Sequence, residues 1–140
     1  MKMKTKKYVF LEHTADIKIK TYGKNINEIF ENFALAVSNY LARGKKIKSK
    51  IKKIIKLSGD DKEALLYSFL DELIYLLDAK SFVVNKAKVK IEDNKLEALV
   101  YGDDASKYKD LDYIKAATYS EMYIKQKKDR VWEAQVVLDV

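Results

Sequence analysis

The sequence predicts an α+β domain in which two helices pack on one face of a mostly antiparallel sheet of about six to seven strands. Segments with alternating apolar and polar residues lie at both ends of the chain, and two segments between them carry apolar residues at helical spacing. No repeat, linker or change of composition divides the 140 residues. A chain of this length most simply forms one domain, spanning residues 1–140.

Two strands and a helix are predicted first. Tyr8–Leu11 and residues 17–22 are strand-like, and the second of these segments alternates isoleucines with lysines. Apolar residues then recur at helical spacing from Ile26 to Leu41, with Asn25 or Asn27 placed to cap the first turn. This helix should end near Arg43-Gly44, where glycine supplies a C-cap. The expected order is therefore strand, strand, helix.

A third strand and a second helix follow. Lysines alternate with isoleucines over residues 48–57, which predicts a strand with one solvated face. Residues 58–61 then open a helix, because acidic residues in a first turn interact favourably with the helix dipole. The apolar stripe of this helix continues to Leu77 and is wide enough to cover a sheet.

The C-terminal part of the chain is predicted to form four strands. They span residues 82–92, 95–101, 113–125 and 131–140, with a turn at 93–94. In the last strand the apolar residues at 132, 134, 136 and 138 face one way. This leaves the other face to Glu133, Gln135, Val137 and Asp139.

Composition narrows the classes of function. The net charge is +7, from 28 basic and 21 acidic residues, and almost all basic residues are lysines. Lysine lacks the planar fork of arginine, so specific base reading and DNA binding are not expected, and RNA contact should be indirect or weak. No apolar stretch approaches the ~20 residues that span a bilayer. The absence of cysteine excludes disulfides and thiolate chemistry. We therefore expect a cytoplasmic protein that does not bind membranes.

A polar segment interrupts the first two predicted strands. It contains Glu12, the only histidine, His13, and Asp16. One interpretation is a turn in which Thr14 and Asp16 cap local backbone groups. The other is a site. With one histidine and no cysteine, a metal site here would consist mainly of carboxylates, which suits magnesium or calcium better than zinc.

The end of the chain carries a second concentration of oxygen ligands. Asp139 follows an apolar run, and the carboxylate of Val140 lies directly after it. Taken alone, Asp139 is a solvated acid at the end of a strand, and a terminal carboxylate is usually frayed. Antiparallel pairing would bring both groups beside Asp16, which would place three or four oxygens around one cation.

Other parts of the sequence give less support for a binding or catalytic site. Lys115 could point at a phosphate or at an acid such as Asp139, but it is also one of many lysines on strand faces. The lysines of residues 45–56 form a basic stripe without the interleaved aromatic residues of RNA-reading surfaces. There is no P-loop, dinucleotide fingerprint or nucleophile elbow. Intrinsic enzymatic activity is not expected.

Three blocks of sequence together resemble the archease family. They are the segment from Phe10 to Ile17, with His13-Thr14-Ala15-Asp16 at its centre, the segment from Ile114 to Tyr119, and the closing segment from Trp132 to Val140. They occur in the family's order, and the resemblance extends over essentially the whole chain.

The resemblance implies a non-catalytic accessory protein of tRNA splicing. Members of this family assist a GTP-dependent RtcB-type RNA ligase by promoting guanylylation of its active-site histidine and by allowing repeated turnover. The family's metal site, described as binding calcium, maps onto Asp16, Asp139 and Val140, although magnesium or manganese would suit the same ligands. Lys115 resembles a residue needed to activate the partner, and Glu12 and His13 are further candidates for this role.

The match has two departures, and other functions stay open. Ser120 stands where the family usually has a histidine, and Asp103 stands where it commonly has glutamate. One alternative function is a nonspecific RNA-binding or chaperone-like module that acts through the lysine-rich face. Another is a metal-dependent hydrolase that uses His13.

Overall fold

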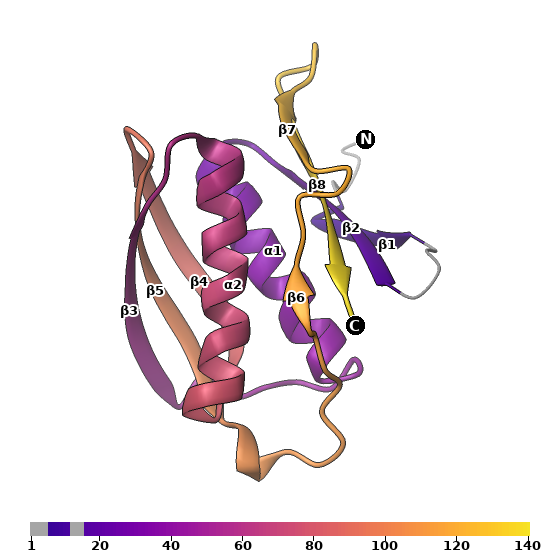
Figure 1. The fold of residues 1–140 in the computed structure, drawn as a ribbon, viewed down its shortest axis with the longest axis vertical. Helices are drawn as coiled ribbons and strands as arrows, with labels where there is room; N and C mark the ends of the chain where they lie inside the picture. Colours follow the sequence, from indigo (N-terminus) through magenta and orange to yellow (C-terminus); the bar gives the residue numbers. More distant parts are fainter. Residues whose placement is uncertain (1–5, 12–15) are drawn as a thin grey trace, which may run out of the picture.

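The computed structural model describes residues 6–11 and 16–140. In this part of the chain two α-helices and eight strands form one α+β domain with antiparallel sheets, which confirms the predicted fold class (Figure 1). The elements are β1 (Tyr8–Leu11), β2 (Asp16–Gly23), α1 (Ile26–Leu41), β3 (Ile51–Ser58), α2 (Lys62–Lys80), β4 (Phe82–Glu92), β5 (Lys95–Asp104), a short 3-10 helix η1 (Ala105–Lys107), β6 (Ala116–Ala117), β7 (Tyr123–Gln126) and β8 (Trp132–Asp139).

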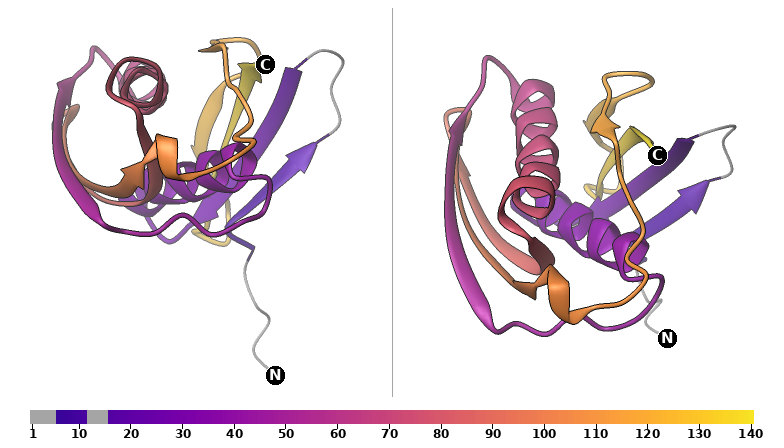
Figure 2. Two further views of the ribbon diagram at one scale, coloured as in Figure 1. Left: turned by 90° about the horizontal axis from the view of Figure 1, so that it is seen from below. Right: turned by 60° about the horizontal axis from the view of Figure 1, so that its bottom comes forward.

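The prediction of a single sheet is wrong, because the described strands form two sheets. One has five strands in the order β1-β2-β8-β6, with β7 also paired to β8, and the other has three strands in the order β3-β5-β4. Both helices contact both sheets: α1 packs on β4 and β2, and α2 packs on β4 and β6. Figure 2 shows the three-stranded sheet curving around the helices, with the five-stranded sheet on their other side.

The buried surface of helix α1 explains why the fold has two sheets. Its start is capped by Asn25, whose side chain accepts a hydrogen bond from the Glu28 amide. A helix on one face of a sheet buries a single stripe, but α1 buries residues around most of its circumference. These are Ile29, Phe30, Asn32, Phe33, Ala34, Ala36, Val37, Ser38 and Leu41. A helix buried on this many sides needs cover from more than one layer.

Side-chain hydrogen bonds tie α1 to strands of both sheets. The Asn32 amide donates to the Tyr22 carbonyl at 2.6 Å. On the other side, carboxylate and amide oxygens of α1 accept from the backbone of β4, where Val89 N–H donates to Glu31 at 2.9 Å and Ile91 N–H donates to an asparagine of α1 at 3.0 Å. These bonds satisfy amides along the free edge of β4, which would otherwise be open to further pairing.

The predicted strand 113–125 is also wrong. It divides into the two-residue β6 and the separate β7, which pair with different parts of β8. Between them the chain turns, with Glu121 in the left-handed region at φ 54° and the Met122 amide donating to the Tyr119 carbonyl at 3.2 Å. The Tyr119 ring stacks on Tyr67 of α2 at 4.4 Å between ring centroids, which is a contact outside the sheet.

The face of β8 that carries polar side chains is largely covered. Glu133, Gln135 and Val137 are all buried. The Tyr123 hydroxyl donates to Glu133, and the Gln135 amide donates to the Glu121 carbonyl at 2.8 Å. The turn before β7 and the first residue of β7 therefore supply the hydrogen bonds that make burial of these polar groups tolerable.

Helices that cross a membrane must be long and apolar, and neither helix in residues 6–11 and 16–140 has both properties.

Candidate metal centre at the chain end

Asp16 and Asp139 lie directly opposite each other in the five-stranded sheet. Strands β2 and β8 pair in antiparallel register, and Asp16 is the Cα partner of Asp139. Side chains of directly opposed residues leave the same face of a sheet, with Cβ atoms about 4.5–5.5 Å apart. The sheet thus brings together two carboxylates that are separated by most of the sequence.

The end of β8 is held on both sides. Ala116 of β6 is the second Cα partner of Asp139, and the Lys115 amide donates to the Asp139 carbonyl at 2.8 Å. A chain terminus usually frays because its backbone groups are not tied down. Here the pairing extends to Asp139, so Val140 directly follows the paired position.

Two carboxylates in directly opposed positions repel each other. One oxygen of Asp16, Oδ1, is buried, which increases the cost of its charge. A cation at this place would offset the repulsion. The carboxylate oxygens of Asp16 and Asp139 are the kind of ligand that calcium and magnesium prefer.

The structure brings two predicted ligands, Asp16 and Asp139, together, and the carboxylate of Val140 stays a prediction. Within the described residues there is no group of three or more His, Cys, Asp or Glu side chains that could hold a metal ion. Calcium takes 6–8 oxygen ligands, so backbone carbonyls, water or partner groups would have to complete its shell. An incomplete shell is suited to a site that also contacts another molecule.

The structure places the other predicted site residues as follows. Glu12 and His13 lie outside the described residues. The side chain of Lys115 is exposed, and its backbone lies beside Asp139. Ser120 lies in the turn after β6, where its amide donates to the Thr118 hydroxyl at 3.2 Å.

One ion pair near the aspartates was not predicted from the sequence. Lys18 Nζ contacts Glu121 Oε1 at 2.9 Å, and Lys18 lies opposite Val137 on the sheet face that carries Asp16. The spacing of Lys18 two residues after Asp16 indicated a shared face. Nothing in the sequence connected Glu121 to it, because that contact depends on the turn between β6 and β7.

Asp103 belongs to a different cluster, near the end of β5. Its carboxylate is 2% exposed, accepts from the Tyr108 hydroxyl at 2.7 Å and lies 3.7 Å from Lys107 Nζ. The same hydroxyl accepts from the Lys48 amide at 2.9 Å, so the cluster joins the segment before β3 to the segment after β5. This arrangement gives Asp103 a structural role.

This cluster predicts how stability depends on pH. The hydrogen bond from Tyr108 holds the pKa of Asp103 below its usual value, against the effect of burial. A carboxyl whose pKa is lower in the folded state stabilises the protein above its unfolded pKa of about 3.9, and this stabilisation is lost as the pH falls through the lower, folded value. We expect the melting temperature to fall on acidification below about pH 4, and to fall less steeply for Tyr108→Phe, which is already less stable at pH 7.

Thermal unfolding at pH values from 7 to 3 measures this pH dependence of the melting temperature. Tyr75→Phe, on the exposed face of α2, is the matched control. Parallel pH curves for Tyr108→Phe and the unmodified protein would show that the hydroxyl does not set the pKa of Asp103.

Comparisons with known proteins agree over nearly the whole chain. Residues 8–140 match the model of the Archease protein family (MTH1598/TM1083). Protein archease of Pyrococcus furiosus is 43% identical over 135 residues, which cover 92% of this chain and 95% of that protein. Protein archease of Pyrococcus abyssi is 37% identical over 141 residues, which cover 96% of this chain and 99% of that protein.

The fold is similar to a solved structure as well. The solution structure of Methanobacterium thermoautotrophicum protein 1598 has a TM-score of 0.74 and 26% sequence identity, and the match covers 96% of this chain and 99% of that one. Since the sequence blocks, the family model and the relatives all agree from the first strand to the last residue, this chain belongs to the archease family.

Proposed function

We propose that this protein is a non-catalytic activator of an RtcB-type RNA ligase in tRNA splicing, acting in the cytoplasm. In this role it promotes guanylylation of the ligase and allows the ligase to turn over repeatedly, while the ligase carries out the chemistry. Membership of the archease family supports the choice of partner. The observation that carries the proposal for the site is the direct pairing of Asp16 with Asp139 beside the chain terminus.

The proposal includes a bound divalent cation, most simply calcium. Asp16, Asp139 and the carboxylate of Val140 would hold it, because these groups share one end of the five-stranded sheet. When bound, the cation supplies positive charge where the protein otherwise presents three carboxylates, and it can accept further oxygen ligands. The residues of the chain contribute the fixed position of these carboxylates.

Lys115 is proposed to face the ligase. Its amide fixes the end of β8, and its exposed side chain extends from the same segment. A flexible lysine beside a carboxylate cluster is suited to contact a phosphate or an acidic side chain of a partner. Glu12 and His13 are assigned to the same partner-facing role from the family resemblance.

Covalent attachment of GMP to the ligase tests the proposal. The cognate ligase is incubated with radiolabelled GTP, with and without this protein, and the rate of labelling is measured. We expect the protein to raise this rate by about tenfold or more, equivalent to about 1.4 kcal/mol of barrier. An equal rate in the presence and absence of the protein would contradict the proposed function.

A further inference from the structure

The outer face of the three-stranded sheet concentrates positive charge. Its register places six lysines on the side of the sheet that faces away from the helices, and all six are exposed. We call this surface the lysine face. It consists of Lys52, Lys56, Lys86, Lys88, Lys90 and Lys95.

The lysine face is only partly neutralised by the protein itself. The acidic residues on the same face of the strands are Glu92 and Glu97, and Lys90 Nζ lies 3.8 Å from Glu92. Lys52 and Lys86 lie on either side of Tyr101, and Lys56 and Lys90 lie on either side of Glu97. Like charges at this spacing repel, so a polyanion that neutralises them would bind with a favourable electrostatic contribution.

Apolar and aromatic groups lie between the rows of lysines. Tyr101 and Leu99 come from the central strand β5, and Lys86 Nζ lies 5.6 Å from the centroid of the Tyr101 ring. Ile54, between Lys52 and Lys56 on β3, is 63% exposed. Surfaces that bind single-stranded nucleic acid combine cationic groups for the phosphates with flat or apolar groups for the bases.

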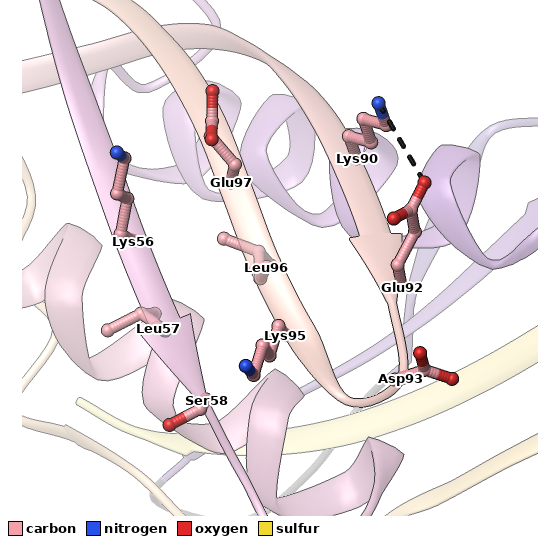
Figure 3. Close-up of a pocket in the computed structure, with 9 residues that line it drawn as sticks. All are labelled: Lys56, Leu57, Ser58, Lys90, Glu92, Asp93, Lys95, Leu96 and Glu97. Carbon is pink, nitrogen blue, oxygen red and sulfur yellow. Dashed lines mark ion pairs between the residues drawn. The ribbon is translucent and has the colours of Figure 1, made fainter.

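A pocket at one end of the lysine face is also lined by lysines and apolar side chains. Figure 3 shows Lys56, Glu97 and Lys90 extending from three adjacent strands, with Lys95 near the β4–β5 turn. The pocket has a volume of 680 Å³. Lysines spaced two residues apart along a strand are separated by about 6.6 Å, which presents a regular row of charges instead of one anion pocket.

We propose that the lysine face binds the phosphate backbone of single-stranded RNA without sequence preference. Lysine, a point charge without a bidentate fork, suits backbone contact better than base reading. The three-stranded sheet, whose outer face carries these lysines, and the C-terminal end of β8 lie on opposite sides of the helices (Figures 1 and 2). RNA on this face would therefore leave the proposed ligase-facing end of β8 open. The RNA binding itself does not depend on the proposed function, but its use in holding RNA for a ligase does.

Fluorescence anisotropy with a labelled 20-nucleotide oligo(U) tests the proposal on the full chain in the absence of ligase. The test variant carries Lys52→Gln, Lys86→Gln and Lys88→Gln. The matched control removes the same charge at three exposed lysines elsewhere, Lys80→Gln, Lys109→Gln and Lys128→Gln. We expect the test variant to lose at least about tenfold in affinity and its salt slope to fall by about 2, while the control loses less than about threefold.

Three results would overturn the proposal. The first is equal loss in both variants, which would show a response to net charge alone. The second is no binding by the unmodified protein at low salt. The third is binding of polyglutamate as tight as that of oligo(U), which would assign the lysine face to an acidic protein. Because the assay contains no ligase, its failure leaves the guanylylation result unaffected, and a failed guanylylation experiment leaves RNA binding unaffected.

Discussion

Replacing Asp139 by asparagine is expected to abolish calcium binding at the chain end and stimulation of the ligase, while the fold stays intact. Asp139 is one of the proposed ligands, and it pairs directly with Asp16. Loss of groups that only support metal ligands typically costs about 10–100-fold in affinity, so loss of a ligand should cost at least about 100-fold. Isothermal titration with calcium measures this loss.

The stability of Asp139→Asn with and without calcium is an independent test of the site. Without calcium, Asp139→Asn should be as stable as the unmodified protein or more stable, because one of two opposed negative charges is removed. With calcium at 100 times its dissociation constant, the unmodified protein should gain about 2.7 kcal/mol, and the variant should gain nothing. Asp71→Asn, at an exposed position on α2, removes the same charge elsewhere and should behave as the unmodified protein. A full calcium response by Asp139→Asn would refute the site.

The substitution Gly102→Ala is expected to cause the largest loss of stability. Gly102 lies in β5, between β3 and β4, and a Cβ atom there would lie 2.1 Å from the Val83 carbonyl oxygen and 2.7 Å from Cζ of Phe82. The carbonyl belongs to a paired strand and the ring is buried, so neither can move without loss of packing. We expect a loss of more than about 3 kcal/mol, at the upper end of measured costs of overpacking.

Thermal or urea unfolding measures this cost, with Gly44→Ala as the control. Gly44 has a positive φ of 82°, but an added Cβ would meet nothing within 4 Å. The control should therefore cost only about 1 kcal/mol, from backbone strain. If the two variants were equally stable, the close approach of β4 to Gly102 would not matter for stability.

Local patterns in the sequence predicted local structure well. The first helix begins at Ile26, where the helical spacing starts, and Asn25, one of the two predicted caps, caps it. The prediction that it ends near Arg43-Gly44 is wrong, because it ends at Leu41. Strands β1, β4 and β8 also lie where the sequence pattern predicted them, with bounds that differ by at most one residue. These elements were predictable because capping, helical spacing and alternation are all local.

The arrangement of the strands was less predictable. Alternation shows which face of a strand is buried, but it does not show which strand lies beside it. The chain has two sheets because β2 pairs with β8 and β3 pairs with β5, and both choices join distant parts of the sequence. The segment 113–125 reads as a strand, but the Tyr119–Tyr67 stack and the positive φ of Glu121 divide it.

The two proposed sites also differ in how far the sequence predicts them. The opposition of Asp16 and Asp139 follows from antiparallel pairing of the strands that carry them, so the sequence could anticipate it, while the metal they hold stays a prediction. The lysine face could not be anticipated from the 45–56 stripe. Its aromatic residue, Tyr101, comes from β5, and half of its lysines come from β4.

The most direct test of the account is the number of ligations that each ligase molecule completes when RNA and GTP are in large excess. The ligase is assayed alone, with the unmodified protein and with Asp139→Asn at equal concentration. We predict repeated rounds with the unmodified protein, and a single round both without it and with the variant. Repeated rounds supported by Asp139→Asn would contradict the claim that carboxylates at the chain end activate the ligase.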